Sequence, residues 1–453
     1  MSQGTNRRQF MRVSTLAGVA AALSLRTAAR GQERRDEYRG PIGFSAPPLE
    51  KVRMAFVGIG LQGGWHVRNF LQIEGVEIKA LCDIDEARAR EVREWVIEAG
   101  RSAPDLYTRG ESDYRRLCER DDIDLVFNAT PWRWHVPVCL EAMESGKHTA
   151  VEVPAAYTAD DCWRLVETAE KSRRHCVMME NCCYGQRELM ILNMVRKGLL
   201  GELLHAEGGY IHDLRSIKFS DQNEGLWRLE HSIDRNGNLY PTHGIGPLAQ
   251  CFDINRGDQF DFVVSMSSNA RGLDLYAAKH LGPDDARRRH YSLGDMNSSL
   301  IRTKLGRTIL LQHDTTSPRP YSRINLVQGT QGTVTGYPDR VYVEGRSPEH
   351  DWETLESYRD EFEHPLWLEL ATAAAGAGHG GMDFLEDFRL IQSLRSGSPT
   401  DMDVYDAAAW SVICELTETS VANRSMPVDF PDFTRGSWKE NRPLGIVSSQ
   451  NLL

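Results

Sequence analysis

No segment of this 453-residue sequence is apolar for long enough to cross a bilayer as a helix, which takes about 20 consecutive apolar residues. The chain also lacks a stripe of lysine and arginine, the usual mark of a nucleic-acid-binding surface. Its formal net charge is −11, although an acidic chain can still bind an anion at one site. We therefore expect neither a membrane span nor a nucleic-acid partner.

The cysteines contain no C-x-x-C pair, and their number is odd. Several of them lie inside strand-like apolar runs, where a free cysteine behaves as a small buried hydrophobe. We therefore predict neither a disulfide framework nor a metal site from cysteine. The nine positions are Cys82, Cys118, Cys139, Cys162, Cys176, Cys182, Cys183, Cys251 and Cys414.

Acidic residues are missing from the first thirty positions, which carry five arginines. Arg7 and Arg8 precede a mildly apolar stretch at 13–23, and a small-residue pair follows at Ala28 and Ala29. This order is typical of a signal peptide, and the arginine pair resembles a twin-arginine export signal. Residues 1–31 therefore predict export of a folded, cofactor-loaded protein to the periplasm or the exterior. The alternative is an ordinary amphipathic helix.

The length favours two or three domains. After a charged and then proline/glycine-rich arm at 32–50, strand-like segments at 52–57, 76–82, 125–129, 148–151 and 176–179 alternate with helical segments at about 63–72, 85–99, 135–145 and 159–172. This alternation predicts an α/β fold, a doubly wound parallel sheet of the Rossmann type, over residues 51–181.

Beyond this point the pattern changes. A helix at 186–197 precedes strand-like segments at 203–214, 260–267, 298–304, 308–313, 323–328 and 340–343, and helical segments return at 367–375, 384–395 and 404–422. We expect residues 182–440 to form an α+β domain with an open-faced, mostly antiparallel sheet and C-terminal helices, followed by a tail at 441–453. The open face predicts a homo-oligomer.

A glycine motif of the form G-x-G-x-x-G opens the first predicted helix. Gly58 suits a tight turn, Gly60 lets the backbone approach a pyrophosphate, and Gly63 lets the helix pack closely on the strand. Asp83 follows at the end of the second strand, where a carboxylate accepts ribose hydroxyls and repels a 2′-phosphate. This context predicts NAD rather than NADP as the cofactor.

Longer motifs resemble the Gfo/Idh/MocA oxidoreductase superfamily, which joins a Rossmann domain to an open-faced sheet domain. They are the glycine motif, the segment from Asn128 to His135, Val151 to Pro154, and Met179 to Gly185. Typical members have Glu-Lys-Pro where this chain has Val153 in the middle position. They also often have Asp three residues before a catalytic His, where this chain has Tyr240 before His243.

These departures match a subgroup, because the Trp-x-Trp-His, Glu-Val-Pro, Glu-Asn-Cys-Cys-Tyr and Asn-Leu-Tyr-Pro-Thr-His-Gly segments resemble glycoside hydrolase family 109. The resemblance runs from Val52 to about Trp438. Besides Gly58 and Gly60, it implies NAD contacts at Gln62, Gly63, Asp83, Trp132, Arg133, Trp134, His135, Glu152, Val153 and Asn181. It implies sugar contacts at Tyr210, Arg228, Tyr240, Pro241, Thr242, His243 and Tyr321.

The activity that this resemblance implies is removal of terminal α-N-acetylgalactosamine with bound NAD. Ordinary glycosidases place two carboxylates across the scissile bond, and the sequence nominates no such pair. A route through transient oxidation at C3, elimination, water addition and re-reduction does not need them. His243 suits the proton of the C3 hydroxyl, because imidazoles exchange protons near neutral pH. Tyr240 would bind that oxygen or steady an enolate, and Tyr184 is the candidate base at C2.

Other interpretations stay open at this stage. The chain could be a net NAD-dependent sugar dehydrogenase of the Gfo/Idh/MocA type, although Val153 replaces the lysine that assists hydride transfer. It could also be a binding protein with a vestigial Rossmann fold. His379, in a glycine-rich segment, either approaches the site or ends a helix. Purely structural roles remain possible for six assigned residues: His243, His135, Tyr210, Arg228, Trp132 and Trp134.

Overall fold

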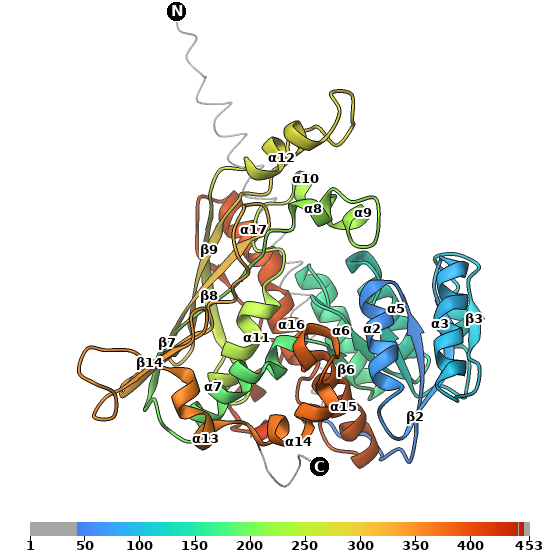
Figure 1. Ribbon diagram of the computed structural model, residues 1–453, viewed down its shortest axis with the longest axis horizontal. Helices are drawn as coiled ribbons and strands as arrows, with labels where there is room; N and C mark the ends of the chain where they lie inside the picture. The colour runs from blue at the N-terminus through green and yellow to red at the C-terminus, as the bar shows by residue number, and fades with distance from the viewer. Residues whose placement is uncertain (1–42, 443, 448–453) are drawn as a thin grey trace, which may run out of the picture. The chain divides into compact units, whose positions relative to one another are not determined.

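The computed structural model describes residues 43–442 and 444–447. The predicted export signal and most of the predicted arm and tail therefore lie outside the described residues. Among the described helices, none combines the length and the apolar character that a membrane crossing requires. Two sheets organise this part of the chain, one at the right of Figure 1 and one at its left.

Sheet A is parallel throughout and has the strand order β3-β2-β1-β4-β5-β6. Its strands are β1 (Val52–Val57), β2 (Val76–Cys82), β3 (Asp105–Tyr107), β4 (Leu125–Asn128), β5 (His148–Val151) and β6 (Cys176–Met178). Every residue of β4 and β5 is buried, as expected for central strands with helices over both faces. This order is that of a dinucleotide-binding Rossmann sheet, so the predicted fold of the first domain is confirmed.

The helices of this domain begin where local chemistry favours a start. The Asp85 carboxylate accepts the N–H groups of Ala87 and Arg88 and so caps α3, and Thr158 caps α6 in the same manner. The helix after the glycine motif begins at Leu61, about two residues before the expected start. The elements are α2 (Leu61–Phe70), α3 (Glu86–Glu98), α4 (Tyr114–Cys118), the short 3₁₀ helix η1 (Trp132–Trp134), α5 (His135–Glu144) and α6 (Ala159–Ser172).

Sheet B is mixed but mostly antiparallel, in the order β14-β13-β12-β11-β7-β10-β9-β8-β15, with β7 and β10 parallel. Its strands are β7 (Leu203–Ile211), β8 (Phe260–Ser267), β9 (Asn297–Thr303), β10 (Thr308–Asp314), β11 (Leu326–Gly329), β12 (Gly332–Thr335), β13 (Arg340–Val343), β14 (Glu353–Thr354) and β15 (Val428–Asp429). The predicted open-sheet domain is therefore also confirmed.

Helices between the sheets join the two halves (Figure 1). They are η2 (Asn181–Tyr184), α7 (Gln186–Arg196) and α11 (Thr242–Cys251), with short helices on the connections: α8 (Arg215–Lys218), α9 (Gly225–Arg228), α10 (His231–Asp234), α12 (Gly272–His280), η3 (Leu355–Tyr358) and α13 (Arg359–Phe362). The segment around His243, where the sequence analysis placed no helix, is helical. Gly244 explains the difference: a Cβ there would lie 2.6 Å from the backbone N of Gly209, so the glycine lets α11 pack tightly on β7.

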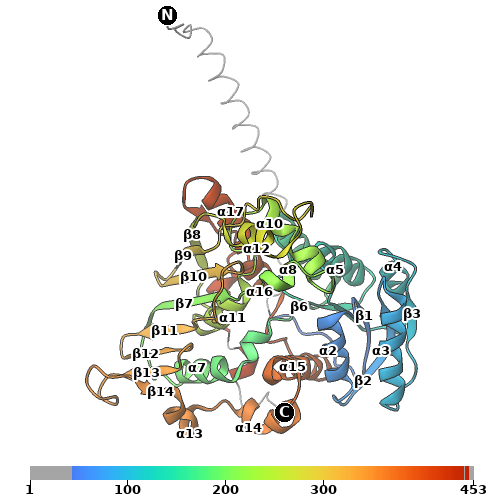
Figure 2. The same cartoon turned by 45° about the horizontal axis from the view of Figure 1, so that its top comes forward.

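The C-terminal helices contact both halves of the chain. They are α14 (Pro365–Ala374), η4 (Gly378–Gly381), α15 (Met382–Ser396), α16 (Val404–Ser411) and α17 (Ile413–Ala422), with two short 3₁₀ turns, η5 (Ser437–Lys439) and η6 (Gly445–Val447), beyond them. Figure 2 shows α15 beside α2, while α16 packs on α6 and α17 on β8. The single helix expected at 404–422 is divided at Val412.

Candidate active site

A cavity of about 920 Å³ opens where the carboxyl ends of β1, β2 and β4 face the strands and loops of sheet B. Ligands of doubly wound folds bind at this edge, at the point where the strand order reverses. Most of the predicted contact residues line it: Gly58, Gly60, Gln62, Asp83, Trp132, Arg133, Trp134, His135, Glu152, Val153, Asn181, Tyr210, Arg228, Tyr240 and His243.

The glycine turn between β1 and α2 leaves room for a dinucleotide. Gly58 has φ +82°, and a Cβ on it would lie 2.7 Å from the Ala129 carbonyl oxygen. A Cβ on Gly63 would lie 2.1 Å from the Gly58 oxygen, whereas a Cβ on Gly60 would meet nothing within 4 Å. The outer glycines therefore close the turn, and the middle one opens onto the cavity beside the free N–H groups of α2. This cradle fits the pyrophosphate of NAD.

Asp83 lies at the end of β2 and lines the cavity. One of its carboxylate oxygens accepts the Ile59 N–H at 2.8 Å, and the other accepts the Asp85 N–H at 2.9 Å. Arg88, which the sequence analysis did not consider, donates to the carbonyl oxygens of Ile59 and Gly60 at 2.8 Å each. The turn is thus held from both sides, and the Asp83 carboxylate is placed where a Rossmann domain receives the adenosine ribose.

The loop after β4 forms a second wall. The Trp132 indole donates to the Val153 carbonyl oxygen at 3.2 Å, which ties this loop to the segment after β5. Both ring nitrogens of His135 lie 2.8 Å from backbone carbonyl oxygens, those of Pro154 and Thr130. Burial lowers the pKa of His135. Its ring therefore braces the loop at the start of α5 while still lining the cavity.

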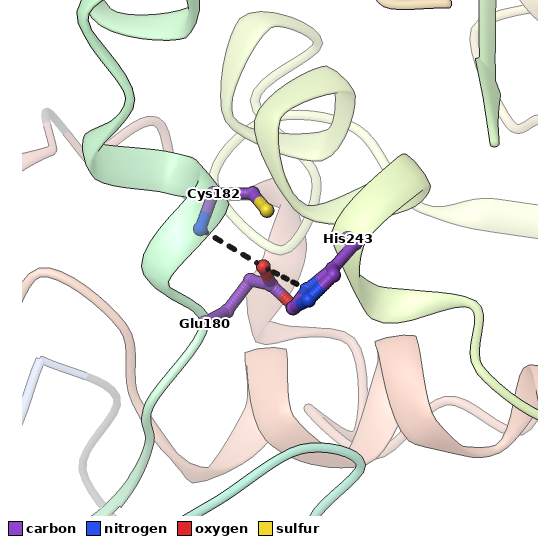
Figure 3. A group of neighbouring side chains, drawn as sticks. All are labelled: Glu180, Cys182 and His243. Atoms are coloured by element: carbon purple, nitrogen blue, oxygen red, sulfur yellow. Dashed lines mark hydrogen bonds and ion pairs between the residues drawn. The ribbon is translucent and has the colours of Figure 1, made fainter. Parts of the chain in front are cut away.

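His243 sits at the first turn of α11, with 13% of its side chain exposed, and faces a carboxylate buried behind it. Its Nδ1 lies 2.7 Å from Oε1 of Glu180, which also accepts the Cys182 N–H at 3.1 Å (Figure 3). Burial alone would raise the pKa of Glu180, but the charge and hydrogen bond of His243 outweigh it and lower that pKa. The carboxylate thus orients the imidazole as the aspartate does in a serine-protease triad.

Glu180, Cys182 and His243 also bring three types of metal ligand within 4.8 Å of one another. A thiol binds a metal as the thiolate, and burial raises the pKa of Cys182 well above its ordinary value. The Cys182 thiol instead donates to the Asn181 side-chain oxygen at 3.4 Å. These contacts favour a hydrogen-bonded histidine–carboxylate pair over a metal centre.

Aromatic rings surround His243 on the cavity side. The rings of Tyr210 and Tyr240 lie 4.6 Å apart between centroids, and each packs edge-on against His243. Arg228 lies over the Tyr240 ring at 5.2 Å and donates to Glu224 at 2.7 Å. Burial raises the pKa values of both tyrosines, so their hydroxyls remain hydrogen-bond donors. Such rings and donors suit a sugar, which offers apolar faces and hydroxyl edges.

Five predicted residues do not line the cavity. Gly63 packs inside the turn, and Pro241 and Thr242 form the start of α11 behind His243. Tyr321 lies one ring away, its centroid 6.2 Å from that of Tyr210, and its hydroxyl accepts from Arg323. The Tyr184 side chain points away from the cavity, toward Asp401.

The geometry does not support Tyr184 as the base at C2. Its hydroxyl donates to Asp401 at 3.2 Å, and its carbonyl oxygen accepts the Trp367 indole N–H. Burial, with the charge of Asp401, raises its pKa well above the ordinary value. The chain turns at η2, so Asn181 reaches the cavity while Tyr184, three residues on, packs toward the C-terminal helices.

Sequence reasoning missed two groups that the fold brings to the site. Glu180 was part of a quoted motif, but nothing local showed that it would meet His243, 63 residues away. Asp383 on α15 accepts from Asn181 at 2.7 Å and from Gln62 at 3.2 Å. His379 lines the cavity beside them, so the first of the two alternatives stated for it holds.

Family models match both halves of the chain. The model described as "Oxidoreductase family, NAD-binding Rossmann fold" matches residues 52–180, and "Glycosyl hydrolase 109, C-terminal domain" matches residues 184–440. A curated glycosyl hydrolase family 109 protein of Shewanella pealeana is 48% identical, over 98% of this chain and 99% of the relative. The chain belongs to glycosyl hydrolase family 109. It is a member of a hydrolase family built on an NAD-binding Rossmann domain, as its motifs predicted.

Three further proteins are similar to this family 109 chain. A relative from Shewanella oneidensis named alpha-N-acetylgalactosaminidase is 47% identical, over 98% of this chain and 99% of its own length. A levoglucosan dehydrogenase solved with NADH and L-sorbose superposes with a TM-score of 0.66 at 19% identity, covering 85% of this chain and all of the other. An inositol dehydrogenase homologue of Azotobacter vinelandii with NAD⁺ gives a TM-score of 0.63 at 20% identity. At these identities the solved structures show the shared fold alone.

Proposed function

We propose that this family 109 chain is an α-N-acetylgalactosaminidase that keeps NAD bound through its catalytic cycle. The supporting observation is that one cavity is lined both by the glycine turn and by His243, which Glu180 holds from behind. The named relative of Shewanella oneidensis supports the choice of sugar. When bound, NAD supplies a reversible hydride acceptor, so C3 of the sugar can be oxidised and later reduced.

The chain's own contribution is position and proton transfer. Nδ1 of His243 is committed to Glu180, which leaves Nε2 as the nitrogen available to take the C3 hydroxyl proton and return it. The Tyr240 hydroxyl, kept protonated by burial, is a donor toward the oxygen that gains charge at C3. Arg228 and Tyr210 would hold the sugar ring in place.

The test is turnover of an aryl α-N-acetylgalactosaminide by the protein as isolated, without added NAD. We expect release of the phenol with no net NADH, because each hydride returns to the sugar. His243→Ala should abolish release but keep NAD bound, whereas His205→Ala, on β7 outside the cavity, should leave the rate unchanged. NADH formed in proportion to substrate, without phenol, would identify a net dehydrogenase instead.

We also propose that the chain is exported in the folded state, which its paired arginines and its cytoplasmic cofactor support. The experiment is expression in a bacterium with periplasmic fractionation. Arg7→Lys combined with Arg8→Lys should retain the protein, with NAD bound, in the cytoplasm. Export of that variant would overturn the proposal.

Finally, we propose self-association through the open face of sheet B. Val264, Leu300 and Leu310 form an apolar row across β8, β9 and β10, and 49% of Leu300 is exposed. A second copy of this chain offers a matching apolar row. Leu300→Lys should convert the wild-type oligomer to a monomer in light-scattering measurements, and a monomeric wild type would contradict the idea.

A further inference from the structure

A small cavity lies behind one wall of the large one. Its volume is about 20 Å³, and a single water molecule needs about 10–15 Å³ of such space, so the cavity holds one small species. Four residues line both cavities: Trp132, Leu214, Arg228 and Tyr240. The small cavity, which we call the rear cavity, therefore shares a wall with the place that we assign to the sugar.

Short helices and one strand supply the polar groups of the rear cavity. They come from α8, α9, α10 and the end of β10, and the three helices lie close together in Figure 1. None of the described residues that line the rear cavity carries a carboxylate. The residues with charged, imidazole or aliphatic hydroxyl side chains are Lys218, Arg228, His231, Ser232, His313 and Thr315.

The Lys218 side chain is buried and has one proton to spare. Its Nζ donates to the hydroxyl oxygens of Ser232 and Thr315, at 3.0 Å each, and an ammonium group has three N–H donors. Burial and the charge of Arg228 lower the pKa of Lys218 to about 7, although nearby carboxylates oppose this. Those carboxylates do not line the rear cavity. An anion placed beside the ammonium would compensate for its burial.

The neighbours of Lys218 are donors as well. Ser232 and Thr315 accept from Lys218, and neither hydroxyl proton has an acceptor within the described part of the chain. Burial lowers the pKa of His231 to about 4, so its ring is neutral. Arg235, which can only donate, lies 3.3 Å from Nδ1 of His231, so the single proton of that ring is on Nε2.

His313 gives an independent sign that the rear cavity is occupied. Its side chain lies on β10 and is 2% exposed, and its Nδ1 has no hydrogen-bond partner among the residues that the structure describes. Burial lowers the pKa of His313 to about 3, so the ring is neutral and its Nδ1 is free to carry the proton. A buried polar atom without a partner in a native protein indicates a bound species that satisfies it.

A halide ion suits these groups better than a water molecule. Water accepts about two hydrogen bonds and has two protons of its own to place, whereas a halide accepts from each donor around it and places none. The charge of a halide also offsets the repulsion between Lys218 and Arg228. Carboxylates, phosphate and sulfate are polyatomic and need more room than a space for one water.

We propose that the rear cavity binds one halide ion, ordinarily chloride, and that this ion steadies Arg228 from behind the sugar site. The only side-chain hydrogen bond of Arg228 among the described residues runs from Nε to Glu224. The rest of its guanidinium therefore takes its position from the rings and charges around it. Binding of the halide does not depend on the proposed function; only its effect on the glycoside does.

The first experiment measures melting curves of the NAD-loaded, full-length protein in sodium gluconate, with sodium chloride added at constant ionic strength. Gluconate is too large for the rear cavity. We expect the melting temperature to rise and saturate, by about 2 °C at ten times the dissociation constant. Lys218→Met keeps the length of the side chain but removes its charge, and should abolish this rise.

Lys147→Met is the matched control. Lys147 is also buried, but its Nζ donates to the Ser145 carbonyl oxygen in the Rossmann half, so this variant should keep the chloride-dependent rise. The melting curves themselves show whether each variant folds. A wild-type melting temperature that does not respond to chloride would overturn the proposal, and so would a response that persists in Lys218→Met.

Diffraction from crystals grown in sodium bromide locates the ion. We expect an anomalous peak in contact with Nζ of Lys218 in the wild type and no such peak in Lys218→Met. Density there without anomalous signal would identify a water molecule and overturn the halide site.

Kinetics test the link to Arg228. Chloride should lower KM for an aryl α-N-acetylgalactosaminide about threefold in the wild type, the worth of less than one hydrogen bond, with little change in kcat. In Lys218→Met, KM should not respond to chloride. A wild-type KM independent of chloride would refute this link. If the glycoside is not hydrolysed at all, the proposed function fails, while the melting and diffraction experiments still decide the halide site.

Discussion

His66 on α2 and Asp387 on α15 are 321 residues apart in sequence, and their side chains meet at 2.8 Å with neither exposed to solvent. The other ring nitrogen of His66 lies 2.9 Å from Glu152, which lines the cavity. Burial alone would lower the pKa of His66, but the charge and hydrogen bond of Asp387 and the bond to Glu152 outweigh it and raise that pKa well above the ordinary value. The last third of the chain thus supports the cofactor wall.

Asp387→Ala would leave the buried His66 without its main partner. Breaking a buried pair from one side costs about 3–5 kcal/mol, so we expect a loss of this size in the free energy of unfolding, measured in urea. Glu361→Ala removes an exposed ion pair with Arg346 and should change stability by less than about 0.5 kcal/mol. Equal stabilities of the two variants would contradict the role given to the contact between His66 and Asp387.

Glu180→Gln should act on catalysis rather than on binding. Without the carboxylate, His243 loses the group that fixes its tautomer, and kcat should fall by about 10²- to 10⁴-fold, the usual worth of a positioned general base. KM and NAD content should stay near wild type, and the pH profile of kcat should change shape. A wild-type kcat would show that His243 does not depend on this contact.

Two glycines should respond differently to the same added methyl group. Gly244→Ala places a Cβ 2.6 Å from the Gly209 backbone, and overpacking of this kind costs about 1–3 kcal/mol, which a lower melting temperature will show. A Cβ on Gly60 meets no protein atom within 4 Å. Gly60→Ala should therefore perturb stability less than Gly244→Ala while weakening NAD binding. Tight NAD binding by Gly60→Ala would argue against this cradle.

Glu386 should make stability depend on pH. Neither of its carboxylate oxygens has a hydrogen-bond partner among the described residues, and burial raises its pKa well above 4.5. A carboxyl whose pKa rises on folding destabilises the folded state as the pH climbs above its unfolded value. Glu386→Gln should therefore be more stable than wild type at pH 8 and much closer to it at pH 4. A constant difference in unfolding free energy across that range would refute this.

Much of the Rossmann half could be predicted because its signals are local. The apolar run of β1, the glycine turn and Asp83 lie within about thirty residues, and the period of apolar positions located most strands and helices to within a few residues. The short elements β3 and α4 were not predicted, because three to five residues are too few to show a period. The helix α11 could not be predicted in this way. Gly244, Gly246 and Pro247 disfavour a helix, and only the close packing of α11 against β7 overrides that preference.

The residues of the site likewise fall into those that local sequence predicts and those that only the tertiary structure brings together. The order of residues alone established the cofactor turn, since a phosphate cradle depends on glycines a few positions apart in one turn. The fold alone decided that Glu180 meets His243, that Tyr184 turns away to Asp401, and that Asp383 reaches Gln62. Such pairings join segments separated by tens to hundreds of residues. No periodicity records them, because they follow from how helices and sheets pack against one another.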